Sequence, residues 1–444
     1  MPEENKECQQ GAEVPVPAWV TDRGAINETV FIDEFLRAMP MKYRDGEFIL
    51  DDGALRDPES IKSFIYKCIS PFVCTCLNAR VESLYKAMKH ACRDSSSQPP
   101  ATDEIYVMNG MYKLGVGFVD ERKIVSCRLR AAYDPDAGTP VRFFEFLHDL
   151  LHEEDIQALQ EYLGYCLIPS TKAQKLLMII GKGGEGKSCL GNIARGIWGE
   201  SMVSASISKI ECDRFARSML VNRLLMVDDD MKLEALNKTN NIKTIVTAEQ
   251  PIDIERKNEP SRQAFIRCKF LCFGNGVLQS LYDRSNGFYR RQMIIRTKDK
   301  PKDRKVNPCL ADEILEHEKS GILNWLIAGL ERLIANNYIF SESQRMKANL
   351  LEAYRDGNNA VEFMKSTGYI EKDPEGRITS KNLYDVYKIW CCENGITPMG
   401  RQSFMTYLIE NQEMYEIQYS RGLRESGRQV RGFIGLKSDI AAYQ

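Results

Sequence analysis

The sequence has no apolar run long enough to cross a membrane. A membrane-spanning helix needs about 18 consecutive apolar residues, whereas the longest candidate, residues 322–330, contains an asparagine and ends against Glu331 and Arg332. The amino-terminal residues MPEENKECQQ are acidic and polar and therefore predict no signal peptide. We expect a cytoplasmic protein without a membrane partner.

An excess of charge of either sign is also lacking. Lys and Arg number 60 and Asp and Glu number 62, which leaves a formal net charge of −2. This balance excludes a protein that binds nucleic acid through bulk positive charge, although it says nothing about local clusters. Hydrophobic residues make up 43% and charged residues 27% of the 444-residue chain, so we expect a globular protein of about three domains.

The sequence lacks cysteines and histidines at the spacing typical of a zinc site, although it has 14 cysteines. Cys74 and Cys76 stand close together, but no second pair completes a C-x2–4-C site. His148 and His152 stand four residues apart on an expected helix, and we interpret them as ordinary surface or core residues. The scattered cysteines, many of them in apolar runs, indicate reduced thiols, and no structural metal is expected.

Three expectations concern secondary structure outside the recognisable motifs. Apolar residues at spacings of three and four predict helix through residues 26–92 and an amphipathic helix pair over 310–335. Strand-like runs surround the turn signal Asn109-Gly110, and residues 124–127 look like a further strand. From residue 175 onward, short apolar runs alternate with helical patterns, which predicts an α/β fold.

Residues 181–188, with the sequence GKGGEGKS, fit the phosphate-loop pattern G-x-x-x-x-G-K-[ST]. A strand candidate, 176–180, precedes the loop and a helix candidate, 187–198, follows it, which disfavours a flexible linker. In such a loop the backbone N–H groups surround the β-phosphate, the lysine reaches the β- and γ-phosphates, and the serine binds Mg²⁺. The residues expected to bind ATP are Gly181, Gly183, Gly184, Gly186, Lys187, Ser188 and Cys189, and Ser188 is also expected to bind Mg²⁺.

Polar residues follow the next two apolar strand candidates. Nucleotide hydrolysis needs one carboxylate to hold Mg²⁺ and another to orient or deprotonate the attacking water. We assign Asp228 to Mg²⁺ and Asp229 to the water, and the adjacent Asp230 leaves this register open by one residue. Asn275 follows the later strand and can hydrogen-bond the γ-phosphate or the water. Taken alone, such residues are also common in turns.

Arg290 and Arg291 form an adjacent pair beyond the asparagine strand. An arginine presented to the γ-phosphate of a neighbouring subunit stabilises the charge of the transition state, whereas a surface pair is the simpler interpretation. The order of phosphate loop, acids, asparagine and arginines within residues 181–291 resembles the superfamily 3 helicases, a ring-forming branch of the AAA+ ATPases. More closely, it resembles the helicase part of phage and plasmid primase-helicases, which are related to the poxvirus type.

The resemblance continues outside these motifs, upstream in residues 108–114, 131–137 and 157–167 and downstream in residues 321–330. It implies ATP and Mg²⁺, a homo-hexamer, and 3′-to-5′ unwinding of DNA during replication of a phage, plasmid or other mobile element. The chain departs from the family's pattern at Glu185, whose charge we expect to point away from the phosphates, and at Asp229, where the family usually has Glu. The segment before the match is too short for the fused primase, so a separate primase or initiator protein is an expected partner.

With this resemblance the chain divides into five expected segments. They are an N-terminal tail and helical accessory domain (1–103), a family-specific segment (104–170), an AAA+ core (171–300), a helical lid (301–358) and a winged-helix DNA-binding domain (359–444). The last assignment comes from helices followed by a hairpin, with Ser380 as the expected N-cap of the first helix. A winged helix that contacts protein rather than DNA is the alternative.

Basic residues in two regions are candidates for DNA contact. Residues 242–258 resemble the family's pore hairpin, and there we expect Arg256 and Lys257, supported by Lys243, to hold the phosphate backbone; a solvated basic loop is the alternative. In the C-terminal segment, Arg401 opens the expected recognition helix. The residues expected to track phosphates at the wing are Arg421, Arg424, Arg428 and Arg431.

The function expected from the sequence is therefore that of an ATP-dependent DNA helicase acting on single- and double-stranded DNA. One alternative is an origin-binding replication initiator whose ATP binding switches assembly without processive unwinding. Another is a phosphate-loop ATPase that acts as a switch and does not bind DNA.

Overall fold

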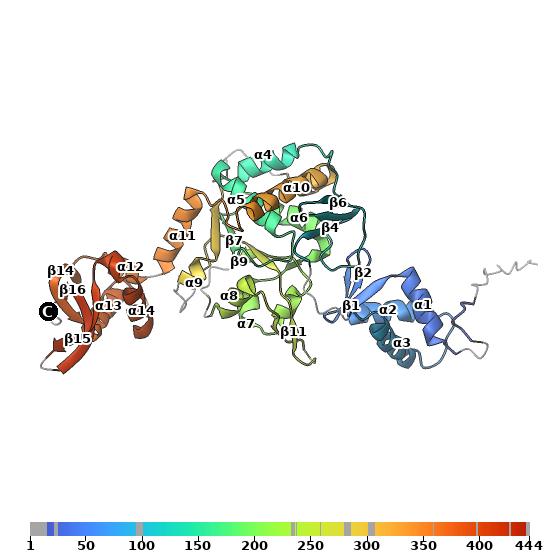
Figure 1. Ribbon diagram of the computed structural model, residues 1–444, viewed down its shortest axis with the longest axis horizontal. Helices are drawn as coiled ribbons and strands as arrows, with labels where there is room; N and C mark the ends of the chain where they lie inside the picture. Colours follow the sequence, from blue (N-terminus) through green and yellow to red (C-terminus); the bar gives the residue numbers. More distant parts are fainter. Residues whose placement is uncertain are drawn as a thin grey trace, which may run out of the picture.

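A computed structural model gives the structure of the chain. It describes residues 16–21, 25–94, 101–231, 236, 238–257, 259–278, 286–300, 307–357, 359–396, 398–425 and 428–440. Most of the expected N-terminal tail lies outside the described residues. A central α/β body stands between the N-terminal domain and the C-terminal domain, and the three lie in a row (Figure 1).

The N-terminal domain combines helices with a small sheet. Its elements are α1 (Glu28–Ala38), β1 (Met41–Arg44), β2 (Glu47–Leu50), β3 (Leu55–Arg56), α2 (Pro58–Ile69) and α3 (Leu77–Ala91). The expectation of helix throughout residues 26–92 is therefore wrong. Asp45 and Gly46 have φ values of 52° and 79°, and this turn joins β1 and β2 as an antiparallel hairpin. Apolar spacing alone did not reveal the hairpin, because short apolar runs fit either element.

The next segment begins with a three-stranded antiparallel sheet and ends in two helices. Its elements are β4 (Glu104–Val107), β5 (Gly110–Lys113), β6 (Gly117–Val119), α4 (Val141–Leu150) and α5 (Glu153–Tyr165). The strand expected at residues 124–127 is absent, because side chains rather than a neighbouring strand bind this part of the backbone. The buried Arg128 donates to the carbonyl oxygen of Lys123 at 2.7 Å, and Ser201 Oγ donates to that of Ser126 at 3.3 Å.

The central body is built on a five-stranded parallel sheet, which confirms the α/β class. Its strands are β7 (Leu176–Ile180), β8 (Met202–Ser204), β9 (Leu225–Met231), β12 (Lys269–Gly274) and β13 (Gln292–Arg296), arranged in the order β13-β7-β12-β9-β8. The elements that connect them are α6 (Lys187–Trp198), η1 (Gly199–Ser201), α7 (Ile207–Cys212), η2 (Ala216–Leu220), α8 (Asn240–Thr247), α9 (Asn286–Tyr289) and a hairpin of β10 (Ile252–Ile254) and β11 (Arg262–Ala264).

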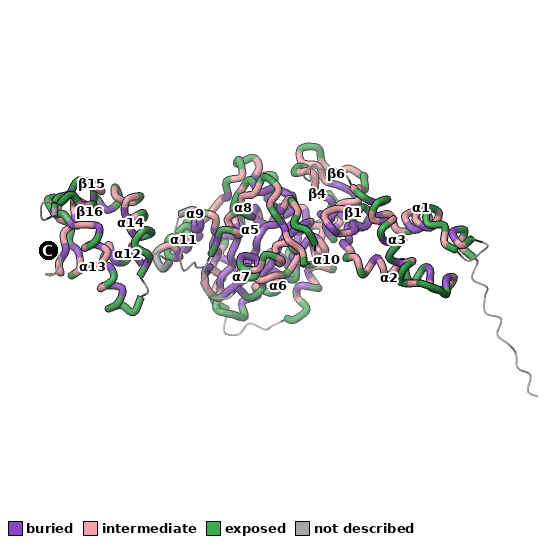
Figure 2. The backbone as a smooth tube through the Cα atoms, turned by 90° about the horizontal axis from the view of Figure 1, so that it is seen from below, coloured by how far each residue is buried: buried purple, intermediate pink, exposed green. Residues whose placement is uncertain are grey.

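Both faces of this sheet are covered. One face packs under α4, α5, α6 and α10 (Leu310–Ala335), and the other packs against α7 and α8 (Figure 1). Figure 2 shows the buried residues concentrated in this body. Burial on both faces explains why the strands read as nearly continuous apolar runs in the sequence.

Helix α10 is a single helix, so the expected helix pair over residues 310–335 is wrong. The stretch contains no proline, and its glycines serve close packing instead of breaking the helix. A Cβ atom on Gly329 would lie 2.7 Å from the carbonyl oxygen of Gln160, and one on Gly164 would lie 2.4 Å from that of Leu326. These glycines let α5 and α10 approach closely over the sheet.

Helix α11 (Gln344–Gly357) leads to the C-terminal domain. The elements of that domain are α12 (Asn359–Phe363), β14 (Ile370–Thr379), α13 (Ser380–Glu393), α14 (Arg401–Glu410), α15 (Gln412–Tyr415), β15 (Gln418–Glu425) and β16 (Arg428–Ser438). The expected hairpin is extended by β14, which pairs with β16 and was not predicted. The N-cap of α13 is Thr379 and not Ser380, because the Thr379 hydroxyl accepts from the N–H of Asn382 at 3.2 Å. Across the described ranges, no helix is both long and apolar enough to span a bilayer.

Candidate nucleotide site

The phosphate loop lies at the edge of the sheet where the parallel strands end. It leaves β7 between the ends of β12 and β13. The N–H of Gly181 donates to the carbonyl oxygen of Gly274 at 3.0 Å, and the N–H of Thr297 donates to that of Ile180 at 2.8 Å. The sequence did not point to Thr297, and its only signal was a polar residue after the apolar run of β13. In open α/β sheets this edge is the usual place for a ligand.

Glycines are required by the backbone of the loop. Gly183, Gly184 and Gly186 have φ values of 112°, 82° and 118°, a region that other residues rarely adopt. Helix α6 begins at Lys187, directly after the last of them. The N–H of Cys189 in its first turn donates to the carbonyl oxygen of Gly186 at 3.0 Å. The amino end of the helix carries the positive end of its dipole and therefore favours an anion.

Glu185 occupies the centre of the loop. Its side chain is buried, and its two carboxylate oxygens accept from the N–H of Gly183 at 2.7 Å and from Lys187 Nζ at 2.9 Å. The expectation that this charge points away from the phosphate position is wrong. Desolvation favours the neutral acid, but the hydrogen bonds from Lys187 and from backbone N–H groups outweigh it and lower the pKa of Glu185. The backbone N–H groups and the lysine of the loop, which can bind a phosphate, therefore bind the Glu185 carboxylate here.

The three acids of β9 face different surroundings because side chains alternate along a strand. Asp228 is buried, and its Oδ2 accepts from the N–H of Ile207 at 2.8 Å, at the start of α7. Burial raises the pKa of Asp228. Asp229 is exposed and lies against α6, since a Cβ atom on Gly191 would come within 3.0 Å of its Oδ1. Of the two assigned acids, Asp229 is the one directed toward the phosphate-loop helix.

Asn275 is exposed and follows β12 directly, between the ends of β7 and β9. The structure therefore brings it to the same edge of the sheet as Lys187, Ser188 and Asp229. Ser188 is exposed in the first turn of α6, and Cys189 is half-buried behind it. Hydroxyl, carboxylate and amide oxygens are the ligands that Mg²⁺ prefers, so the group of side chains at this edge fits that ion.

The arginine pair lies at the opposite edge of the sheet. Arg290 and Arg291 precede β13, and the N–H of Leu176, the first residue of β7, donates to the carbonyl oxygen of Arg291 at 2.8 Å. A strand of this length separates them from the phosphate loop by about 16 Å. The guanidinium of Arg291 donates to the carbonyl oxygen of Gly287, whereas Arg290 is exposed. Neither arginine is placed to reach the loop of its own chain.

The expected pore hairpin is shifted along the chain. Residues 242–247 belong to helix α8, and the observed hairpin is β10–β11. Lys243 therefore lies on a helix. Arg256 Nη1 donates to the carbonyl oxygen of Gly46 at 3.1 Å, so it holds the hairpin against the N-terminal domain. Lys257 is exposed. The expected hairpin ended at Asn258, which lies outside the described residues.

The C-terminal domain brings several of the predicted basic residues together. Arg401 is the first residue of α14, and it lines a cavity of about 670 Å³ with Arg431 of β16 and Lys381 of α13. Lys381 was not among the predicted residues. Arg421, Arg424 and Arg428 are exposed on the β15–β16 hairpin. The arginines therefore follow one hairpin and the start of one helix.

Comparisons with known proteins concern two parts of this description. Residues 179–291, from β7 to the arginine pair, match a family described as of unknown function, DUF5906. The A form apo structure of the NrS-1 C-terminal region is 14% identical, with a TM-score of 0.50, and the match covers 91% of this chain and 98% of that one. A second A form structure, of residues 305–718, gives 14% identity, a TM-score of 0.48, and coverages of 91% and 98%. A further apo structure of that region is 12% identical, with a TM-score of 0.48, and the match covers 93% of this chain and 100% of that one. The TM-score of 0.50 for the first match indicates that the chain is similar to the NrS-1 C-terminal region in its fold.

Proposed function

We propose that the protein is an ATP-dependent DNA helicase of superfamily 3 that acts in replication of a phage, plasmid or other mobile element. One observation carries the proposal: the G-x-x-x-x-G-K-S loop leaves β7 at the carboxyl edge of a parallel sheet, beside Asp229 and Asn275 on neighbouring strands. This combination of anion-binding loop, acid and amide is suited to hydrolysing a nucleoside triphosphate. An AAA+ core is compatible with the strand order.

Within this proposal, each polar residue at the sheet edge has a role. Lys187 neutralises charge on the β- and γ-phosphates after its bond to Glu185 breaks. Ser188 and Asp229 hold Mg²⁺, because Asp228 is already bound to the N–H of Ile207. This assignment moves the Mg²⁺ role from Asp228 to Asp229 and gives the attacking water to Asn275 instead of Asp229. Mg²⁺ supplies Lewis-acid stabilisation of the transferring phosphoryl group, and Asn275 orients the attacking water.

A homo-hexameric ring is proposed from the position of the arginines. Since Arg290 and Arg291 lie at the edge of the sheet opposite the phosphate loop, a role at a γ-phosphate requires a second subunit. A head-to-tail arrangement places the arginine edge of one copy against the loop edge of the next, and such interfaces close into rings. Arg290 is the stronger candidate because it is exposed, whereas Arg291 bonds within its own chain.

DNA contacts are proposed for the β10–β11 hairpin and for the C-terminal domain. Lys257 is the exposed basic residue near the hairpin tip. The C-terminal domain has helices α13 and α14 followed by the β15–β16 hairpin, an order that supports a winged helix. In that case Arg401 approaches DNA from the start of α14, and the arginines of the hairpin follow the phosphates.

The decisive experiment measures ATP hydrolysis, with and without single-stranded DNA, beside strand separation on a forked duplex. Lys187→Ala should abolish both activities, and Lys182→Ala, at an exposed residue of the same loop, serves as the matched control. Circular dichroism should show an unchanged fold in both variants. Normal unwinding by Lys187→Ala contradicts the proposal.

A replication initiator is the second candidate, and the exposed arginines of the C-terminal hairpin favour it equally. In this alternative, ATP controls assembly on duplex DNA and the protein separates no strands. ATP hydrolysis without unwinding, together with sequence-specific duplex binding lost on Arg401→Ala, identifies the initiator.

A further inference from the structure

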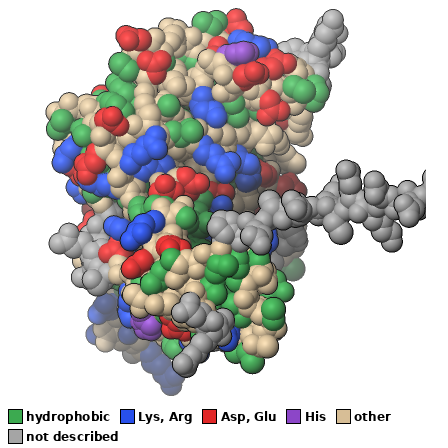
Figure 3. All heavy atoms as spheres, turned by 90° about the vertical axis from the view of Figure 1, so that its right-hand side faces the viewer, with side chains coloured by type: hydrophobic (Ala, Val, Ile, Leu, Met, Phe, Trp, Pro, Cys, Tyr) green, Lys and Arg blue, Asp and Glu red, His purple; other side chains and the backbone are tan. Residues whose placement is uncertain are grey.

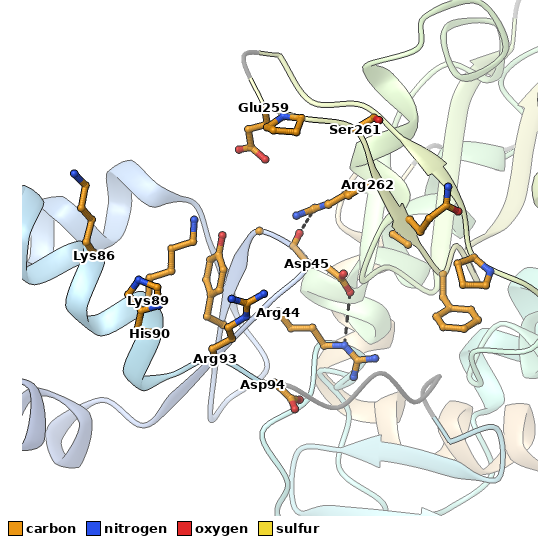
Figure 4. A pocket seen from close by; sticks show the side chains of 17 residues that line it. Arg44, Asp45, Lys86, Lys89, His90, Arg93, Asp94, Glu259, Ser261 and Arg262 are labelled. Carbon is orange, nitrogen blue, oxygen red and sulfur yellow. Dashed lines mark hydrogen bonds and ion pairs between the residues drawn. The ribbon is translucent and has the colours of Figure 1, made fainter.

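A basic groove separates the N-terminal domain from the β10–β11 hairpin of the central body. It encloses about 800 Å³ (Figure 4). Five of its lining residues are Lys or Arg, one is His, and three are acids, in a chain whose net charge is −2. The basic residues are Arg44, Lys86, Lys89, His90, Arg93 and Arg262. Figure 3, seen from the side of the N-terminal domain, shows clusters of Lys and Arg across the middle of that face, with acids between them.

Four of these residues form a stripe that runs along one side of α3 and past its carboxyl end. Helix α3 carries Lys86, Lys89 and His90 at spacings of three and four residues from the first, which places them on the same face of the helix. Arg93 follows the end of α3 at Ala91, and its backbone pairs with that of Tyr43. Lys86, His90 and Arg93 are exposed, and Lys89 covers the ring of Tyr43 with its Nζ 4.8 Å from the ring centroid. The helical part of the stripe, from Lys86 to His90, is about 6 Å long, which corresponds to about two nucleotides at the spacing of one strand in a duplex, and Arg93 extends the stripe beyond the helix.

The opposite wall of the groove is fixed to the N-terminal domain. Arg262 donates to the carbonyl oxygen of Asp45, and Arg256 donates to that of Gly46. Gly46 has a φ of 79°, which residues with side chains rarely adopt, so the turn of the β1–β2 hairpin favours glycine there. Figure 4 shows Lys89 and Arg262 directed into the same gap from opposite sides. The two walls therefore form a pre-organised cleft.

We propose that this groove binds the sugar-phosphate backbone of single-stranded DNA, and so gives the N-terminal domain a direct role in holding the strand. The inference rests on the proposed function for the identity of the nucleic acid. A line of cations suits a chain of phosphates better than a compact anion, and the volume of the cavity is that of a small-molecule site, which accommodates one strand and not a duplex. Arg256 and Arg262 bond the hairpin segment to the N-terminal domain. Binding of a strand in the groove therefore depends on the position of the hairpin.

The test compares two variants with the same change of charge. Lys86→Glu with Arg93→Glu reverses two exposed cations of the groove, and Arg37→Glu with Lys67→Glu reverses two exposed cations of the same domain outside it. Fluorescence anisotropy with labelled oligothymidine, without nucleotide and over a salt series, gives the affinities. The groove variant should bind about tenfold more weakly, and its slope of log K against log salt should be shallower by about 1.4, for two lost phosphate contacts. The control should remain within about twofold of wild type.

Lys86→Gln with Arg93→Gln should weaken binding in the same direction and excludes a fold defect caused by charge reversal. Wild-type crosslinking to bromodeoxyuridine DNA should map to peptides that contain Tyr43 or residues 86–93. Equal weakening in both charge-reversal variants would assign the effect to bulk charge and overturn the proposal, as would unchanged affinity in the groove variant. If the groove variant binds normally while wild type unwinds DNA, the groove proposal fails and the helicase proposal stands. If wild type binds no single-stranded DNA, both fail.

Discussion

Glu185 Oε2 lies 2.9 Å from Lys187 Nζ, so a carboxylate of the chain already holds the lysine that the phosphate loop offers to a nucleotide. The same carboxylate accepts from the N–H of Gly183 at 2.7 Å. Both side chains are largely shielded from water, and the ion pair is therefore poorly screened. A nucleotide that binds here must displace Glu185, and the free energy of this step reduces its affinity.

Glu185→Gln should therefore bind ATP more tightly. The substitution keeps the shape of the side chain and removes the negative charge that competes with the phosphates. We expect the Kd for ATP to fall about tenfold, which corresponds to about 1.4 kcal/mol, and isothermal titration calorimetry measures it. Glu145→Gln, at an exposed position on α4, is the matched control and should leave the Kd unchanged. Equal or weaker binding by Glu185→Gln shows that the carboxylate does not compete.

The two adjacent acids should differ in their effects. Asp229→Asn should lower kcat for ATP hydrolysis by about a hundredfold or more and raise the Mg²⁺ concentration needed, because the carboxylate against α6 is lost. Asp228→Asn keeps an acceptor for the N–H of Ile207 and removes a charge whose burial is unfavourable. It should retain most of the activity.

Stability measurements on Asp228→Asn provide an independent check. Burial raises the pKa of Asp228, so the folded protein holds the proton more tightly than the unfolded chain does. The free energy of unfolding of wild type therefore decreases as the pH rises from the unfolded pKa of about 3.8 through the higher folded value. The variant should lack this decrease and be as stable as wild type, or more stable, at pH 7. If Asp228→Asn loses as much activity as Asp229→Asn, Asp228 also takes part in ATP hydrolysis and the assignment to Asp229 alone is wrong.

The arginine assignment predicts complementation between inactive subunits. Arg290→Ala and Lys187→Ala should each abolish ATP hydrolysis, because each removes one side of a shared site. Randomly mixed subunits form intact sites at about a quarter of the interfaces of a ring, so hydrolysis should partly return on mixing. Arg37→Ala, on the surface of the N-terminal domain, should be fully active. Mixtures that stay inactive, or an active Arg290→Ala variant, are inconsistent with a shared site at this residue.

Lys269 should make stability depend on pH in the alkaline range. Lys269 is the first residue of β12, and its buried ammonium donates to the carbonyl oxygens of Ile168 and Arg267. Burial lowers the pKa of Lys269 from 10.5 to about 8. Between these values the unfolded chain binds the proton and the folded protein does not, so the free energy of unfolding increases with pH, by about 3 kcal/mol in total.

Urea unfolding at pH 7.5, 9 and 10.5 tests this relation, with Lys269→Met as the reference that lacks the titrating group. Wild type should gain stability relative to the variant as the pH rises. Parallel curves for the two proteins would mean that the lysine keeps its proton in the folded state.

Local sequence determined the elements whose residues specify their own conformation. The loop at residues 181–188, the strand before it and the helix that begins at Lys187 were all predictable, because glycines at positive φ and continuous apolar runs have few other solutions. The β1–β2 hairpin and β14 were missed, since their stability comes from pairing and from burial against distant segments. The break expected in α10 was wrong because its glycines serve close packing with α5.

The sequence by itself determined which chemical groups are available for a nucleotide site: a phosphate loop, acids, an asparagine and a pair of arginines in a fixed order. Only the tertiary structure decided which of these residues meet. Strand alternation directs Asp229 to α6 and Asp228 to α7, and parallel pairing places the arginines at the edge away from the loop. The inward turn of Glu185 and the groove between α3 and the β10–β11 hairpin depend on donors and charges brought together from separate segments. Such electrostatic contacts act through space and leave no periodic pattern in the chain.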